Sequence, residues 1–298
     1  MQATHLNGCL ITYWPSAITI LEVNNFRYVS PINFLNLKDA YTLNEPFPHI
    51  VIENFLDPGL ALRGSKEFPP KSDPNWIQYS HYNEDKCAIT ELAKMPEFFN
   101  ELILELNSQS FVKTLEDLTG IRQLKMDPSL HGGGLHMTKK GGFLNIHADF
   151  TAHPINRRWK RRVNLLLYFN DNWNDSYAGH LELWSRDMKS CVHRLSPTLN
   201  RCVIFNTDDD SYHGVPAPLN CPTETTRNSL ALYYYTESAS KAKLKPTNYR
   251  ARPGESDRRM FIWLDKTLVA FYTRTKATLG ISDQKIGIVL RKIRKNKE

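Results

Sequence analysis

The chain has 298 residues, 41% of them apolar, and a mass of 34.5 kDa, so it can bury a core as one large or two small domains. Its formal charge of +7 is unevenly placed: residues 241–298 hold 16 Lys and Arg against 5 Asp and Glu, whereas residues 1–240 hold 22 against 26. A mildly acidic body with a basic C-terminal segment excludes disorder of the whole chain and a uniformly basic nucleic-acid binder.

Cysteine usage and hydropathy bear on the compartment. The five cysteines are scattered and contain no C-x-x-C pair, which favours neither a disulfide framework nor a cysteine-based zinc site. The first seven residues lack the basic start of a secretory signal, and no uncharged apolar run reaches about 18 residues. We therefore expect a soluble, cytoplasmic protein without a transmembrane segment.

Residues 1–126 are expected to form a strand and helix region that supports the core. Residues 49–52 predict a strand, and Asp57-Pro58 predicts the cap and first turn of a helix. Residues 75–90 are polar and aromatic without a period, which predicts an exposed loop that could act as a lid. Apolar residues spaced by about 3.6 over residues 91–120 predict two short helices that end at Gly120.

Between residues 127 and 238 the sequence changes to short β-type runs separated by Gly, Pro, Asn and Asp. The runs lie at 142–147, 163–169, 180–184, 191–195, 201–205 and 229–236. Because no helical pattern intervenes, they predict an antiparallel sandwich, jelly roll or barrel. The expected fold class is mainly β with flanking helices (α+β).

Residues 239–298 return to a helical pattern and form a basic C-terminal extension. The apolar stripe of a helix predicted from about residue 257 to residue 279 consists of Phe261, Leu264, Leu268, Phe271 and Tyr272. This stripe should pack on the core or on a second subunit, which leaves a homodimer through this helix open. The last residues, RKIRKNKE, are the stretch that would attract a membrane surface or a polyanion.

The sharpest chemical feature is His147-Ala148-Asp149, at the end of a predicted strand. Residues i and i+2 of an extended chain point to the same face, so His147 and Asp149 can approach one metal ion. His213, 64 residues further on, is the candidate third ligand. Two imidazoles and one carboxylate form the facial triad of non-haem Fe(II) oxygenases, and no thiolate lies nearby to favour zinc.

Arg227 strengthens this hypothesis, because the H-x-D motif alone occurs by chance in many chains. It opens a further predicted strand, fourteen residues after His213. A guanidinium there can hold a dicarboxylate by a two-pronged ion pair. Ser229 projects from the same face and can add a hydroxyl.

Residues 131–236 resemble the Fe(II)/2-oxoglutarate dioxygenase domain of the prolyl 4-hydroxylase-like superfamily. The resemblance is carried, in the family's order, by GGFLNIHADF, RRVNLLLYFN, GHLELW, NRCVIFNT, YHGVP and RNSLALYYYT. Upstream, EPFPHIVIENFLDP is similar to the strand and helix that precede such domains. The resemblance implies a double-stranded β-helix (jelly roll) core over residues 127–238.

The resemblance also implies roles for individual residues. It makes His147, Asp149 and His213 the iron ligands. It makes Arg227, with Tyr168 and Ser229, the residues that bind the distal carboxylate of 2-oxoglutarate. The implied cofactors are Fe(II), 2-oxoglutarate as cosubstrate and O2, with ascorbate as a reductant.

The chain departs from the family's pattern in two places. Ala178 stands where a Gly-Gly pair usually precedes the next strand, and His136 and Met137 stand where a tyrosine often lies about ten residues before the first ligand. We interpret His136, His153 and His180 as ordinary polar or packed residues, although His153 could line the substrate entrance. The basic run at residues 157–162 is interpreted as a solvated loop that could border the active-site mouth and favour an acidic substrate.

The predicted function is an Fe(II)- and 2-oxoglutarate-dependent dioxygenase that hydroxylates a C–H bond, as prolyl hydroxylases do, and converts 2-oxoglutarate to succinate and CO2. The substrate stays open between a peptidyl, a small-molecule and a carrier-linked molecule, and no specific nucleic acid is expected. The alternative is a catalytically retired jelly roll that serves as a binding or scaffold protein with a basic docking tail.

Overall fold

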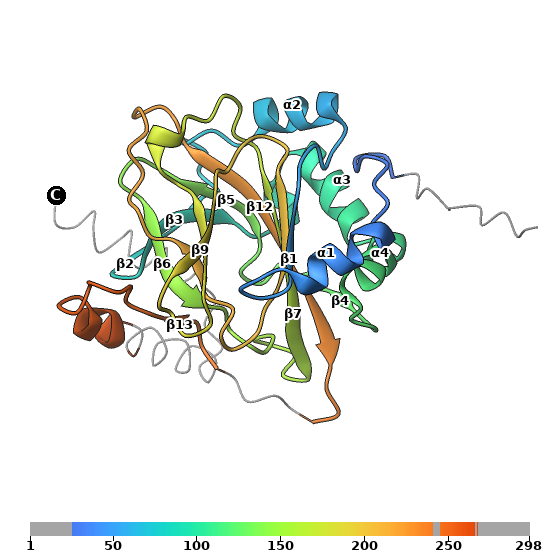
Figure 1. Cartoon of the computed structure of the whole chain (residues 1–298). Helices are drawn as coiled ribbons and strands as arrows, with labels where there is room; N and C mark the ends of the chain where they lie inside the picture. The colour runs from blue at the N-terminus through green and yellow to red at the C-terminus, as the bar shows by residue number, and fades with distance from the viewer. Residues whose placement is uncertain (1–25, 241–244, 266, 268–298) are drawn as a thin grey trace, which may run out of the picture.

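Antiparallel pairing joins the strands into one sheet that folds over on itself (Figure 1). The structure is a computed structural model and describes residues 26–240, 245–265 and 267. The first six strands along the path of pairing are β1 (His49–Ile52), β10 (Cys202–Asn206), β7 (Trp159–Tyr168), β12 (Arg227–Glu237), β5 (Gly134–Thr138) and β3 (Glu84–Ile89). The next four are β6 (Phe143–Ala148), β11 (His213–Val215), β8 (Leu181–Trp184) and β9 (Cys191–Leu195).

The four-strand part of the sheet lies over the six-strand part. Leu181 and Leu183 of β8 pack in one cluster with Val203 and Phe205 of β10 and Tyr168 of β7, although β8 is distant from both strands along the path of pairing. Side chains of the two layers therefore meet in a shared interior. This arrangement is a double-stranded β-helix, or jelly roll, and it confirms the predicted fold class, mainly β with flanking helices.

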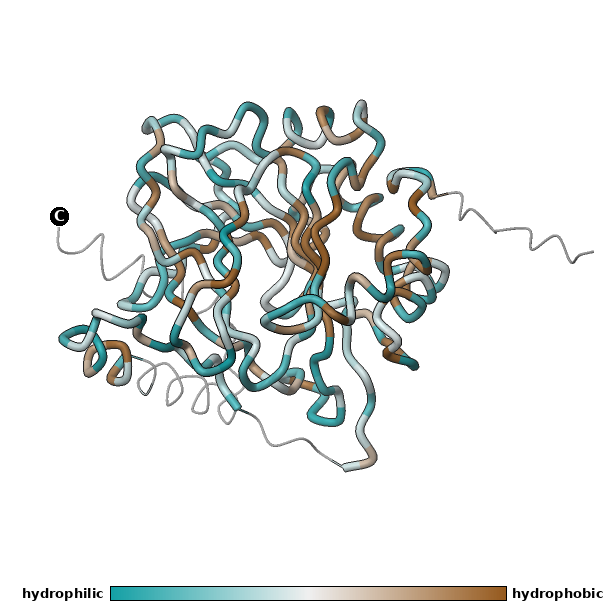
Figure 2. Tube along the Cα trace, viewed as in Figure 1, coloured by the Kyte–Doolittle hydropathy of each residue, from teal (hydrophilic) through white to brown (hydrophobic). Residues whose placement is uncertain are grey.

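Strands β7 and β12 form the middle of the larger layer. Their pairing runs from Tyr168 opposite Ser229 to Trp159 opposite Glu237. Leu165 and Leu167 of β7 are fully buried in the main apolar core, between the layer and the helices. Figure 2 shows the apolar residues gathered in these central strands and in the helices beside them. The nearly all-apolar strand predicted from the sequence is thus covered on both faces.

Helices cover the outer face of the larger layer. Asp57 caps α2 (Pro58–Glu67), with Pro58 at its first position, as predicted. The two helices predicted over residues 91–120 are α3 (Glu97–Leu106) and α4 (Gln109–Thr119), and α4 ends at Gly120, whose φ of 72° is left-handed. Shorter helical pieces are η1 (Leu35–Leu37), α1 (Lys38–Leu43), η2 (Leu92–Lys94) and η3 (Asp175–Tyr177).

The prediction of an exposed loop over residues 75–90 is wrong, because this segment forms a β-hairpin. Strands β2 (Ile77–His81) and β3 pair with each other, and β3 also pairs with β5 and β6. The alternation is hard to recognise in the sequence, since β3 presents the charged Glu84 and Lys86, with the small Ala88 as its only apolar residue, to the interior pocket. The segment is therefore part of the wall of that pocket and not a lid over it.

Residues 245–265 continue the fold beyond the predicted core. Strand β13 (Asn248–Tyr249) pairs with β6, and residues 259–265 are helical. Strand β4 (Lys125–Met126) pairs with β12 on the other side of the molecule. The rest of the helix predicted to residue 279, the basic run at the end and residues 1–25 lie outside the described residues. Among the helices in the described part of the chain, none has the length and apolar character needed to cross a membrane.

Candidate metal centre and its pocket

The structure brings together the three residues predicted as metal ligands. His147 of β6 and His213 of β11 are directly opposite each other, with ring centroids 4.5 Å apart. Asp149, just beyond β6, places its Oδ1 atom 3.5 Å from Nε2 of His147 and its Oδ2 atom 3.6 Å from Nε2 of His213. One ligand atom from each residue lies within 4.8 Å of the others.

The two histidines are oriented by their own strands. Nδ1 of His147 lies 2.9 Å from the carbonyl oxygen of Asn145, and Nδ1 of His213 lies 2.9 Å from that of Ser211. A carbonyl only accepts, so each Nδ1 carries a proton, and each Nε2, the nitrogen left to coordinate a metal, faces Asp149. Burial lowers the pKa of His213 to about 4, which keeps its imidazole neutral as a ligand must be. Two imidazoles and one carboxylate suit Fe(II).

A buried cation that the sequence interpretation did not single out stands beside the triad. Arg161 is 1% exposed, and its Nη2 atom lies 3.2 Å from Oδ2 of Asp149. Its guanidinium carbon lies 3.3 Å from the ring centroid of Tyr233 and 4.5 Å from that of Phe150. Burial by itself would raise the pKa of Asp149, but the buried positive charge of Arg161 overcomes this effect and holds that pKa well below its usual range.

The interpretation of residues 157–162 as a solvated loop is wrong, since β7 begins at Trp159. A β-bulge explains why the sequence pattern does not indicate that Arg161 faces the interior. Tyr234 pairs with Val163 whereas Tyr235 pairs with Arg161, so Arg162 is an extra residue in β7. The bulge shifts the alternation of side chains and turns Arg161 inward. The sequence-based suggestion that this run borders the site was correct for this one residue.

The residues predicted to bind 2-oxoglutarate lie next to one another. Tyr168 and Ser229 are opposite each other in β7 and β12, and both are buried. The Nη2 atom of Arg227 donates to the Tyr168 hydroxyl at 3.4 Å, and its Nε donates to the carbonyl of Gly179 at 2.7 Å. Within the described residues, Arg227 forms no ion pair with a carboxylate. A buried guanidinium without a carboxylate fits an anionic ligand, and the specific roles of these three residues stay a prediction.

A pocket of 170 Å³ opens beside the triad. Its walls are aromatic and charged: Tyr79, Phe150, Tyr233 and Tyr249 provide rings, and Glu84, Lys86 and Arg161 provide charges, beside His147 and Asp149. His136 also lines it, and its interpretation as an ordinary polar or packed residue stays a prediction. Burial and the nearby Lys86 charge lower the pKa of His136 to about 3, so it is a neutral polar group in the wall of the pocket.

A second cluster of Asp127, His131 and His153 resembles a metal site in composition but not in hydrogen bonding. Nδ1 of His153 accepts from the backbone N–H groups of Ile155 at 3.2 Å and Asn156 at 2.9 Å. The proton must therefore sit on Nε2, which lies 3.2 Å from Oδ2 of Asp127. A metal at Nε2 would require the proton on Nδ1, facing two donors. His153 is a packed residue, as predicted. The Nε2 atom of His180 lies 3.3 Å from the Oδ1 atom of Asp175, whose side chain is exposed.

Comparison with known proteins supports the class of protein that the fold and triad define. Residues 133–235 match the family model described as the 2OG-Fe(II) oxygenase superfamily. The matched residues include the triad and Arg227, so the predicted resemblance is confirmed. The family and the fold indicate a 2-oxoglutarate- and Fe(II)-dependent oxygenase, and this family requires Fe(II), 2-oxoglutarate and O2. No curated protein sequence matches the chain.

Several solved structures are similar to this chain at low sequence identity. A prolyl hydroxylase from Trichoplax adhaerens, in complex with a hypoxia inducible factor peptide fragment, is 19% identical, with 67% of this chain and 88% of that chain covered and a TM-score of 0.45. A prolyl-4-hydroxylase from Pseudomonas putida is 15% identical, with 71% and 96% covered and a TM-score of 0.45. HygX from Streptomyces hygroscopicus, with nickel, 2-oxoglutarate and hygromycin B bound, is 13% identical, with 70% and 94% covered and a TM-score of 0.41.

Proposed function

We propose that this protein is a dioxygenase that hydroxylates a C–H bond of its substrate, in the manner of prolyl hydroxylases, and converts 2-oxoglutarate to succinate and CO2. The observation that carries the proposal is the convergence of the His147 and His213 Nε2 atoms on the Asp149 carboxylate. When bound, Fe(II) and 2-oxoglutarate would supply the oxidising chemistry. The protein supplies the ligands, the orientation of both small molecules and a pocket for the substrate.

Arg227, Tyr168 and Ser229 are proposed to hold the distal carboxylate of 2-oxoglutarate. The Gly179 carbonyl fixes Nε of Arg227, which leaves the far edge of the guanidinium for a carboxylate. The Tyr168 hydroxyl, next to Nη2 of Arg227, can donate to the same group. Burial of all three side chains strengthens these polar contacts because little water competes for them.

The aromatic and charged pocket is proposed to receive the substrate. The Nε and Nη1 atoms of Arg161 are buried and form no hydrogen bond with an acceptor in the described residues. A substrate carbonyl or carboxylate would satisfy them, while the rings of Tyr79, Tyr233 and Tyr249 cover its apolar part. This chemistry is compatible with a peptidyl, a small-molecule or a carrier-linked substrate that carries an acceptor oxygen near the reacting C–H bond.

Three finer features are proposed alongside the activity. Ascorbate would serve as a reductant that keeps the iron ferrous. A cytoplasmic location agrees with the cysteines of the described residues, at positions 87, 191, 202 and 221, none of which forms a disulfide there. A homodimer through the C-terminal helix agrees with the exposed apolar side chains of Met260, Trp263 and Leu264.

The test is formation of succinate from labelled 2-oxoglutarate by the purified protein with Fe(II) and ascorbate, with and without a library of peptides and metabolites. We expect slow turnover without substrate, acceleration by a true substrate, and loss of both in His147→Ala. His193→Ala, on the outer strand β9, is the matched control and should retain turnover. Absence of both 2-oxoglutarate binding and succinate formation would favour the alternative, a retired jelly roll with a basic docking tail.

A further inference from the structure

The segment that follows the jelly roll is built onto the strand that carries the first metal ligand. Tyr249 of β13 pairs with His147, and the backbone N–H of Arg250 donates to the carbonyl of Ile146 at 2.8 Å. The Tyr249 ring lies 5.4 Å from the His147 ring. Residues 259–265 then fold as helix and bury Ile262, which is 3% exposed. Residues 245–265 therefore form part of the wall of the metal centre.

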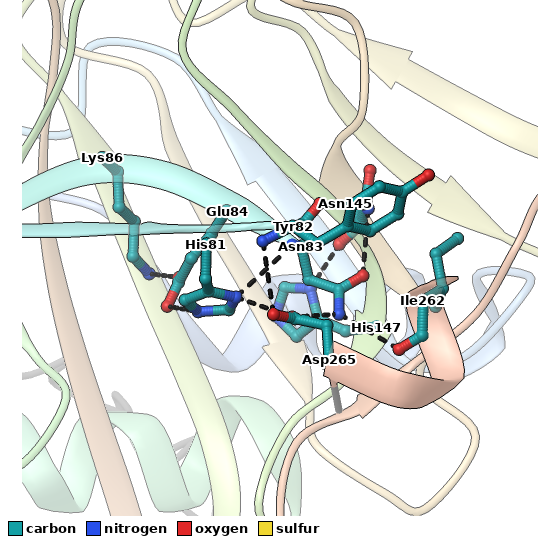
Figure 3. Close-up of polar contacts among 9 residues, drawn as sticks. All are labelled: His81, Tyr82, Asn83, Glu84, Lys86, Asn145, His147, Ile262 and Asp265. Carbon is teal, nitrogen blue, oxygen red and sulfur yellow. Dashed lines mark hydrogen bonds and ion pairs between the residues drawn. The ribbon is translucent and has the colours of Figure 1, made fainter. Parts of the chain in front are cut away.

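Asp265 lies in this helix and receives hydrogen bonds from the turn between β2 and β3 (Figure 3). Its Oδ2 atom lies 2.7 Å from Nδ1 of His81 and 2.6 Å from Nδ2 of Asn83. Its Oδ1 atom accepts from the backbone N–H of Tyr82 at 3.3 Å. One carboxylate thus holds three consecutive residues of a turn that lies more than 180 residues earlier in the chain.

Asn83 connects Asp265 to β6 through hydrogen bonds. Its side chain is fully buried, and its Nδ2 atom donates to Asp265 and to the carbonyl of Ile262 at 3.2 Å. Its Oδ1 atom accepts from Nδ2 of Asn145 at 3.0 Å, and its carbonyl accepts from the Asn145 backbone N–H at 2.9 Å. Every polar atom of the Asn83 amide is therefore satisfied, and Asn145 is held by both its side chain and its backbone.

Asn145 is the residue whose carbonyl accepts the Nδ1 proton of His147. The chain of contacts Asp265–Asn83–Asn145–His147 therefore ends on the bond that fixes the tautomer and the ring plane of a metal ligand (Figure 3). The matching bond of His213 goes to Ser211. The backbones of His213 and His147 lie opposite each other in paired strands, but among the side-chain hydrogen bonds of the described residues none joins Ser211 or His213 to this chain of contacts.

A second arm runs from Asp265 toward the pocket. Nε2 of His81 lies 2.9 Å from Oε1 of Glu84, and Oε2 of Glu84 lies 3.1 Å from Nζ of Lys86. Glu84 and Lys86 both line the pocket beside the triad. Two short chains of hydrogen bonds and ion pairs thus start at the carboxylate of Asp265. One ends at a metal ligand, and the other ends at the charged wall of the pocket (Figure 3).

We propose that Asp265 is a positioning residue of the metal centre, which acts through Asn83 and Asn145 on His147 and leaves His213 unaffected. The proposal rests on the proposed function, because it requires that the triad binds a metal. It assigns to the segment after the jelly roll a role in the geometry of the site. Buried partners of metal-ligating histidines orient the ring and set the basicity of the coordinating nitrogen.

The test uses the full-length protein loaded with Co(II) in place of Fe(II), without turnover. In proton NMR, the Nδ1–H protons of Co(II)-bound histidines are shifted far outside the normal range, so His147 and His213 each give a separate signal, assigned with His147→Gln and His213→Gln. In Asp265→Asn we expect the His147 signal to move and to exchange faster with water, while the His213 signal stays in place. Co(II) affinity should fall by about tenfold, the low end of the effect of such outer partners.

Asp257→Asn, an exposed position of the same segment, is the matched control and should change neither signal. Unchanged signals in Asp265→Asn would overturn the proposal. An equal change in the His147 and His213 signals would also overturn it, because it would report a general loosening of the metal site. If Asp265→Asn does not fold, Asp265→Glu replaces it, and the same selective change at His147 is expected. Failure of the wild-type protein to bind Co(II) would instead refute the proposed function before any variant is compared.

Discussion

The Nη2 atom of Arg161 lies 3.2 Å from the Oδ2 atom of Asp149, so the carboxylate of the triad is paired with a buried cation in the metal-free protein. Arg161 stabilises this carboxylate, but its positive charge also opposes a divalent ion at the same place. The two effects have opposite consequences for the metal-free and the metal-bound protein. They can therefore be separated by measuring stability in both states.

Arg161→Met should destabilise the metal-free protein by about 3 kcal/mol, because it leaves the buried carboxylate of Asp149 without its partner. The bound metal takes over that role, so the stability gained from Co(II) should be larger in the variant than in the wild type. Urea unfolding in chelator and in Co(II) measures both. Arg162→Met, at the half-buried neighbouring position, is the control. An equal loss of unfolding free energy in chelator and in Co(II) would show that Arg161 only fills space.

Arg227→Met should weaken binding of 2-oxoglutarate to the Co(II)-loaded protein by at least about tenfold, since charged hydrogen bonds contribute about 1.5–3 kcal/mol each. Arg227→Lys should restore part of the affinity, because a lysine keeps the charge but not the two-pronged geometry. Tyr168→Phe and Ser229→Ala each remove one neutral hydroxyl and should have smaller effects. Calorimetric titration with 2-oxoglutarate gives the four dissociation constants. Equal affinity in Arg227→Met would place the cosubstrate elsewhere.

The jelly roll and the triad could be predicted because their signals are local. The apolar run in β7 and the His147-Ala148-Asp149 spacing each occupy a few consecutive residues, and the order of the surrounding segments supported them. His213 is the ligand distant in sequence, and the order of the segments together with the family resemblance identifies it. Local periodicity and the family's order of segments therefore predict the sheet and its ligands.

The missed features depend on long-range contacts or on irregular backbone. β3 was missed because two of its three pocket-lining residues, Glu84 and Lys86, are charged, so the strand lacks clear apolar alternation. Arg161 was missed because a bulge in β7 reverses which residues face inward. The contacts of Asp265 join residues about 180 positions apart, and no sequence period encodes them. Polar groups at functional sites violate the binary pattern on which such predictions depend.

The protein should bind one divalent ion per chain at the triad. His213→Ala removes one of the two imidazole ligands and should abolish Co(II) binding at micromolar concentrations. His153→Gln changes the second cluster and should leave the stoichiometry at one, because the hydrogen bonds of His153 assign its proton to Nε2. Equilibrium dialysis followed by elemental analysis counts the ions. A second bound ion that disappears in His153→Gln would contradict the assignment of that proton.

Asp127 should make the stability of the fold depend on pH in the acid range. Burial alone would raise the pKa of this carboxyl, but hydrogen bonds from His153, Ser129 and the backbone N–H of His131 outweigh it and hold the pKa well below its ordinary value. The unfolded chain has the ordinary pKa of about 3.9. Because the folded-state pKa is lower, the ionised carboxylate stabilises the fold above about pH 4, and this contribution is lost as the pH falls below that value.

Asp127→Asn should therefore cost about 2 kcal/mol of unfolding free energy at pH 7, from lost hydrogen bonds to a buried carboxylate, and distinctly less at pH 3. Urea unfolding of both proteins in chelator, at pH 7 and pH 3, measures the difference without contribution from a bound metal. Asp171→Asn, at an exposed position, should change the free energy at neither pH. If Asp127→Asn lost the same free energy at both pH values, the carboxylate would act through its shape and not through its charge.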